Sequence, residues 1–119
     1  MLPQSHSQRY QEFQQALKQM YETAAAKDWH FAGLREQFQE LQQLFKSQIV
    51  SLSSDNLSPD YASRWQSLQT EIHKQMRLLD TDLMLLQASR SSARSLSRAA
   101  SVRERLNTLM VYSQAIIQL

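Results

Sequence analysis

A single glycine, Gly33, is the feature that most restricts what this 119-residue chain can fold into. Phosphate-binding loops of the P-loop and dinucleotide types need several glycines, because only a residue without Cβ lets the backbone approach a phosphate closely. β-Sandwiches and β-barrels need frequent tight turns rich in Gly and Pro, and this chain adds only two prolines. We therefore expect an all-α protein.

The remaining composition narrows the class of protein further. The chain has no cysteine, which excludes a disulfide framework, a thiolate zinc site and a cysteine nucleophile, and is compatible with a reducing cytoplasm. A chain of this length with 42% hydrophobic residues can bury one modest core. No apolar run resembles a signal peptide or reaches the roughly 20 residues of a membrane span. We expect a single helical domain over 1–119, cytoplasmic and without membrane insertion.

Apolar residues spaced three and four apart predict four amphipathic helices, at about 6–26, 28–53, 59–88 and 93–117. Their apolar stripes run over Tyr10–Ala24, Phe31–Leu52, Tyr61–Leu86 and Ala99–Ile116. Short connections between four helices favour an up-and-down bundle, built around a long antiparallel hairpin of the second and third helices. A self-associating coiled coil is the rival architecture, but the stripes are short and slip in phase.

Helix ends can also be placed from the sequence. Asp28 is a plausible N-cap of the second helix, and Ser58 followed by Pro59 is typical of the start of the third. The serine- and arginine-rich segment 89–97 is read either as a turn or as an exposed helix start. Gly33, near the beginning of the second helix, is expected to serve close helix packing or a local kink.

Neither a metal site nor a cofactor site is expected. A di-iron bundle needs Glu-x-x-His motifs and further carboxylates, and the pair Glu71 and His73 has the wrong spacing. The three histidines are His6, His30 and His73, and we place His30 and His73 at the surface or boundary of the bundle.

Catalysis has no support in the sequence either. Asp80 and Asp82 lie about 200° apart on a helix and cannot share a substrate, so we expect them to pair with Arg77 or with arginines of the last helix. A chain with one glycine also lacks the G-x-S-x-G turn of serine hydrolases. We expect a protein that is not an enzyme.

Charge is unevenly distributed along the chain. Residues 1–88 hold eight Lys and Arg and ten Asp and Glu, whereas residues 89–119 hold five arginines and one glutamate. Arg90, Arg94 and Arg98 recur every four residues and would form one ridge on a helix, joined less regularly by Arg103 and Arg105. Such a ridge can dock an acidic protein surface, or it is simply a solvated face. Nucleic acid is not the expected partner, because the segment lacks interleaved aromatic residues.

Apolar residues surround the end of the third helix almost completely, over 78–86. An outer helix of a bundle buries one face, so Met84 and Leu85 are candidates for an apolar patch that contacts a partner or a second copy of the chain. The alternative is a wide core that encloses them all. The patch motivates the expectation of a homodimer.

The second half of the chain resembles a known family. The runs RWQSLQTEIHKQMRLLDTDLMLLQASR (64–90) and VRERLNTLMVYSQAI (102–116) resemble the cyanobacterial PatD family. The resemblance implies a small helical, non-enzymatic protein that binds the tubulin-like division protein FtsZ and promotes assembly or bundling of its filaments. It further implies an effect on cell division, action at the division site and, in filamentous members, an effect on heterocyst differentiation.

Two other functional classes remain open from the sequence. A FliT-like export chaperone is also a small helical bundle, and the C-terminal stripe ending at Ile116, Ile117 and Leu119 could close its apolar groove. An enzyme subunit or RNA-binding helper would rest on the segment 89–98 alone.

Overall fold

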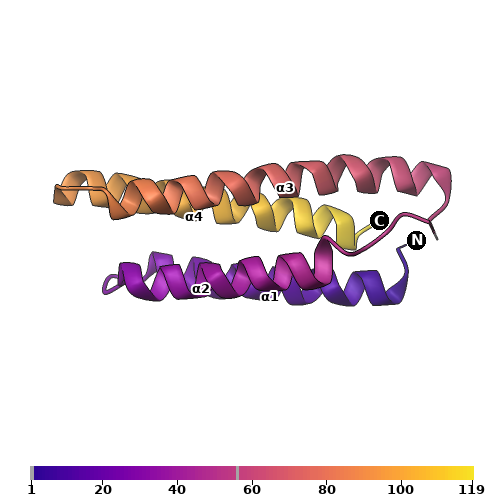
Figure 1. Cartoon of the computed structure of the whole chain (residues 1–119), viewed down its shortest axis with the longest axis horizontal. Helices are drawn as coiled ribbons and strands as arrows, with labels where there is room; N and C mark the ends of the chain where they lie inside the picture. Colours follow the sequence, from indigo (N-terminus) through magenta and orange to yellow (C-terminus); the bar gives the residue numbers. More distant parts are fainter. Residues whose placement is uncertain (1, 56) are drawn as a thin grey trace.

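The computed structural model describes residues 2–55 and 57–119, which form four α-helices and no β-strand (Figure 1). The helices are α1 (Gln4–Ala25), α2 (Phe31–Leu44), α3 (Pro59–Gln87) and α4 (Ser92–Ile117), and α2 continues directly into a π-helical segment, η1 (Phe45–Ile49). The predicted all-α up-and-down bundle is confirmed.

Helices α1 and α4 bury the predicted stripes and no other residues within their bounds. The buried residues of α1 are Tyr10, Phe13, Leu17, Met20 and Ala24. Those of α4 are Ala99, Val102, Leu106, Leu109, Ser113 and Ile116. Helix α4 packs extensively against both α1 and α3, so the core is centred on it. Because each helix buries one face against its neighbours, the three- and four-residue spacing was sufficient to find these residues.

The long hairpin consists of α3 and α4, and its assignment to the second and third helices was wrong. Helix α2 has 14 residues before η1, whereas α3 has 29 and α4 has 26. Helix α2 and η1 pack mainly against α1, and α2 contacts α3 sparsely. The physical reason is that α2 and η1 present the polar side chains of Gln42 and Lys46 toward α3, and a groove is left between these helices.

The start of α2 also differs from the prediction. His30 occupies the N-cap position in an extended conformation (φ −118°, ψ 137°), and Asp28 lies exposed in the preceding turn. Trp29 packs against the core from this connection, and α2 begins two residues later at Phe31. A Cβ at Gly33 would meet nothing within 4 Å, and Gly33 has no positive φ. The expected role of Gly33 in close packing is therefore wrong.

The π-helical turn of η1 follows from the spacing of the buried residues. Leu41, Phe45 and Ile49 are each four residues apart, and in an α-helix two such steps drift about 80° around the axis. A π-helix has more residues per turn, so residues four apart stay closer to one line. The Val50 amide donates to the Phe45 carbonyl over 2.9 Å. The wider turn thus keeps both Phe45 and Ile49 buried.

The helix starts predicted around the third and fourth helices are close to those in the structure. Ser58 is the N-cap of α3 and Pro59 its first residue, although the Ser58 side chain makes no capping hydrogen bond. Ser91 caps α4, where its hydroxyl accepts from the Arg94 amide over 3.2 Å. The serine-rich segment therefore contains both a short turn and the first turns of α4.

A buried hydrogen-bond chain joins α1, η1 and α3. The Tyr10 hydroxyl donates to Gln69 Oε1 and accepts from Trp65 Nε1 over 3.1 Å. Gln69 Nε2 then donates to the Ile49 carbonyl over 3.2 Å. The pKa of Tyr10 is raised because burial disfavours the phenolate, so the hydroxyl keeps its proton. This chain of hydrogen bonds ties η1 and α1 to α3.

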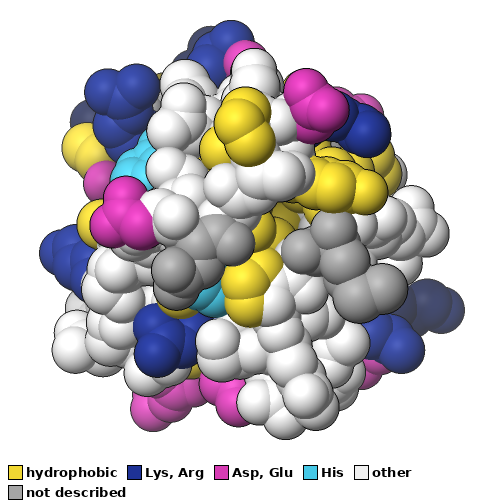
Figure 2. Space-filling model, turned by 90° about the vertical axis from the view of Figure 1, so that its right-hand side faces the viewer, with side chains coloured by type: hydrophobic (Ala, Val, Ile, Leu, Met, Phe, Trp, Pro, Cys, Tyr) yellow, Lys and Arg dark blue, Asp and Glu magenta, His cyan; other side chains and the backbone are white. Residues whose placement is uncertain are grey.

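The two hairpins form two layers of unequal length in a molecule of 50 × 20 × 19 Å. The α3–α4 connection projects further along the long axis than the α1–α2 connection (Figure 1). At the opposite end, hydrophobic side chains gather at the centre and charged side chains lie around them (Figure 2). The projecting end of α3 and α4 thus has no second layer over it.

Candidate functional site

The described residues contain no group of three or more His, Asp or Glu that could hold a metal ion. His6 lies within 3.1 Å of the Ser53 carbonyl oxygen, and the His73 ring packs edge-on against Phe45 with centroids 4.9 Å apart. None of the described helices is long and apolar enough to cross a membrane. The two candidate binding surfaces are the projecting end of the α3–α4 hairpin (Figure 1) and a groove between α2–η1 and α3.

The carboxylates Asp80 and Asp82 take part in separate ion pairs. Asp82 is buried and accepts from Arg105 Nε over 3.0 Å, which confirms the expected pairing with the last helix. Asp80 pairs instead with Arg35 of α2 over 3.8 Å, a partner that the sequence pattern did not single out. Each carboxylate ties α3 to a different neighbour.

Arg103 and Arg105 do not join the proposed ridge. Arg105 also donates to the buried Gln75 over 2.9 Å, so it links α4 to α3 through two polar partners. Arg103 Nη1 donates to the Ala24 carbonyl at the end of α1 over 3.2 Å. Both arginines are half-buried and hold helices together, and the spacing alone gave no sign of these partners.

Arg90, Arg94 and Arg98 lie in the projecting part of the α3–α4 hairpin, which we call the hairpin tip (residues 84–98). All three are exposed, and none pairs with a carboxylate within residues 2–55 and 57–119. Arg90 lies in the connection before α4, so the prediction of one continuous helical ridge of three arginines was wrong. Arg94 and Arg98 are one turn apart on α4.

The predicted apolar candidates Met84 and Leu85 are exposed to 58% and 39%, so the wide-core alternative does not enclose them. Leu96, which the stripe pattern missed, is exposed to 65% in the same tip. Leu96 lies about 200° around α4 from Arg94 and from Arg98, so its apolar side chain and these cations occupy different faces. The tip therefore combines a cationic face with a separate apolar one.

The unequal length of the layers explains why the tip is uncovered. Arg103 marks where α1 ends beside α4, and Leu96 lies two turns further out, about 10 Å along the helix. On the other side, Arg35 marks the first turns of α2 beside Asp80. Helix α2 begins at Phe31, one turn before Arg35, and Met84 follows Asp80 by one turn, so α2 reaches only to the level of Met84 and does not extend over the rest of the tip. The predicted helix lengths did not reveal this overhang, because the second helix was predicted over 28–53, about as long as the fourth, whereas α2 begins at Phe31 and has 14 residues before η1.

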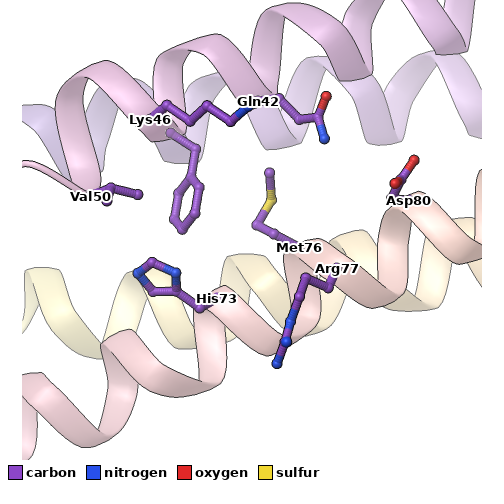
Figure 3. A pocket seen from close by; sticks show the side chains of 8 residues that line it. Gln42, Lys46, Val50, His73, Met76, Arg77 and Asp80 are labelled. Atoms are coloured by element: carbon purple, nitrogen blue, oxygen red, sulfur yellow. The ribbon is translucent and has the colours of Figure 1, made fainter.

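A groove of about 610 Å³ lies where α2 and η1 face α3 (Figure 3). Its apolar part includes Phe45 and Met76, which are only 7% and 5% exposed, together with the exposed Val50. The pKa of His73 is lowered by burial and by the nearby Arg77, which favours an uncharged ring on the groove wall. The stripe pattern predicted Phe45 and Met76 as ordinary core residues. Beside the buried stripe of α2 and η1 runs a second row of residues spaced four apart, and this row is the sequence signal for the groove wall. It consists of Gln42, Lys46 and Val50.

Comparison of the chain with protein-family models, with curated proteins and with solved structures found no match.

Proposed function

We propose that this chain is a non-enzymatic, cytoplasmic regulator of cell division that binds FtsZ at the division site and promotes assembly or bundling of its filaments. The resemblance of residues 64–90 and 102–116 to the PatD family supplies the partner, and with it the expected effect on heterocyst differentiation in filamentous cyanobacteria. The hairpin tip, which lies within this half of the chain, is the proposed contact surface.

The observation that carries the proposal is the charge of the uncovered tip. From Leu83 to Arg103 the chain contains no Asp or Glu, and Arg90, Arg94 and Arg98 are exposed without a carboxylate partner among the described residues. Arginine is favoured in interfaces because its planar guanidinium binds carboxylates through two donors. An acidic surface is therefore the complementary partner, and Met84, Leu85 and Leu96 supply apolar contacts that can fix its position.

Bundling requires at least two filament contacts in one assembly. Pairing of two tips within a homodimer would bring six arginines together without a carboxylate, so a homodimer that serves this function must join elsewhere. A sedimentation mass at micromolar concentration separates a monomer from such a dimer.

The export-chaperone alternative is less well supported. It requires the C-terminal helix to close an apolar groove, but Ile116 is fully buried and α4 packs along both α1 and α3. The groove lies between α2–η1 and α3 instead. A pull-down that recovers an export substrate and no FtsZ would favour the chaperone.

The test is co-sedimentation with FtsZ polymer over a salt series. We expect the triple variant Arg90→Glu, Arg94→Glu, Arg98→Glu to bind at least about tenfold more weakly than the wild type, with the difference shrinking at high salt. The matched control reverses three exposed lysines outside the tip, Lys18, Lys27 and Lys74, and gives the same change in net charge.

Equal binding by the tip variant and the lysine control would remove the tip from the mechanism. Failure of the wild type to bind FtsZ polymer at all would refute the proposed function. Circular dichroism of each variant checks that the helices are retained.

A further inference from the structure

The groove between α2–η1 and α3 is a second surface, distinct from the hairpin tip. Gln42, Lys46 and Val50 extend along one wall, and His73, Met76 and Asp80 come from the other (Figure 3). From Gln42 to Val50 the wall is about 12 Å long, which equals roughly two turns of a helix. The two helix walls therefore offer a cleft in which one more short helix can lie.

The chemistry of the groove selects its occupant. Phe45, Met76 and the ring of His73, which packs edge-on against Phe45, provide an apolar surface. The carboxylate of Asp80 is paired with Arg35, whereas the exposed Lys46 and Arg77 have no carboxylate partner within the described residues. Arg77 points outward from the groove edge (Figure 3). The unpaired charge along the groove is thus positive on both walls.

We propose that this groove binds a short amphipathic helix of a partner protein, with its apolar row against Phe45 and Met76 and acidic residues toward Lys46 and Arg77. The inference does not rest on the proposed function. A second copy docking through the cationic face of its own tip is disfavoured, since Arg94 and Arg98 would face Lys46 and Arg77 with like charge.

The probe is a synthetic, alanine-rich helical peptide of about 15 residues, with two leucines one turn apart and glutamates on both sides of the leucine row. Two matched peptides replace the glutamates by lysines or the leucines by alanines. Fluorescence anisotropy with the full chain measures binding. We expect saturable binding of the glutamate peptide, at least about tenfold weaker binding of each matched peptide, and further weakening of the glutamate peptide with salt.

A charge-swapped protein tests the same contacts from the other side. Lys46 and Arg77 are exposed, so Lys46→Glu with Arg77→Glu leaves the core intact. This variant should lose at least about tenfold in affinity for the glutamate peptide and gain affinity for the lysine peptide. The control variant, Lys18→Glu with Lys74→Glu, carries the same net charge and should bind as the wild type does.

Methyl NMR of the methionines locates the peptide. The Met76 methyl signal should shift on titration with the glutamate peptide, whereas the Met84 signal in the tip should not. No saturable binding up to millimolar peptide, no change of preference in the charge-swapped variant, or a shift confined to Met84 would each overturn the inference. A sedimentation mass that doubles without peptide, together with a shifted Met76 signal, would assign the groove to a second copy and overturn it as well. Because FtsZ is absent from this assay, its failure leaves the co-sedimentation result unaffected.

Discussion

Replacing Tyr10 by phenylalanine removes one oxygen atom from the core and leaves two buried groups without a hydrogen-bond partner. Tyr10 is fully buried, and its hydroxyl is the partner of both Gln69 Oε1 and Trp65 Nε1. Leaving a buried polar group unpaired costs about 1–3 kcal/mol, so two such groups give an expected loss of about 2–4 kcal/mol after partial relaxation. That is a large fraction of the stability of a domain of this size.

Urea unfolding followed by circular dichroism measures the loss. The matched control is Tyr112→Phe, because the half-buried Tyr112 hydroxyl has no hydrogen-bond partner among residues 2–55 and 57–119. We expect the control to stay within about 0.5 kcal/mol of the wild type. In a double-mutant cycle, Tyr10→Phe with Gln69→Leu should cost clearly less than the sum of the two single changes, because Gln69 no longer leaves an unpaired amide oxygen.

The pH dependence gives an independent readout of the same hydroxyl. Burial raises the pKa of Tyr10 above its ordinary value of about 10, so the unfolded chain loses this proton at a lower pH than the folded one. The stability that the raised pKa contributes is present below about pH 10 and is lost above it, by up to about 1.4 kcal/mol per pH unit. Tyr10→Phe removes this term, so the difference between variant and wild type should narrow as the pH rises above 10.

Two results would refute this reasoning. A cost below about 1 kcal/mol would mean that Gln69 and Trp65 find other partners or water in the variant. A difference between Tyr10→Phe and the wild type that is constant from pH 9 to pH 11 would mean that the Tyr10 hydroxyl ionises alike in both states.

Three further predictions concern single residues. Ser113 is fully buried, and its hydroxyl has no partner in the part of the chain that the structure describes, so Ser113→Ala should stabilise by about 0.5–1 kcal/mol; an unchanged or lower urea midpoint would contradict this. Gly33→Ala places a Cβ in open space within α2 and should stabilise by a similar amount, about 0.5–1 kcal/mol, whereas a lower melting temperature would show that Gly33 has a packing role. Burial and Arg77 lower the pKa of His73, so the stability that its neutral ring contributes is fully present above about pH 6.5 and is lost as the pH falls below that. His73→Gln should therefore flatten the acid side of the plot of unfolding free energy against pH, and parallel plots for the two proteins would argue against this reasoning.

Residue spacing predicted the buried faces of α1 and α4 residue by residue, because the packed part of each of these helices buries one face against its neighbours. The same reasoning was less accurate for the second helix. The helix starts only after Trp29, which packs against the core, and the π-helical turn at Phe45–Ile49 changes the direction in which its last residues face. Both effects depend on contacts with other helices, which a local pattern does not contain.

The candidate sites divide in the same way. Met84 and Leu85 could be proposed because an outer helix cannot bury its whole circumference. Arg103 and Arg105 were grouped with the exposed arginines because spacing along α4 does not reveal the Ala24 carbonyl or the Asp82 carboxylate. Those partners lie far away in the sequence and meet the arginines only after folding.

The sequence by itself determined the fold class and most of the core, because a chain with one glycine and four apolar stripes has no stable alternative to packed helices. It also determined that positive charge is concentrated after residue 88. Only the tertiary structure decided which arginines have no carboxylate partner among the described residues, which apolar residues lie beyond the second layer, and where a groove remains between two helices. These properties depend on where one helix ends relative to another, and that alignment is set by packing between segments distant in the chain.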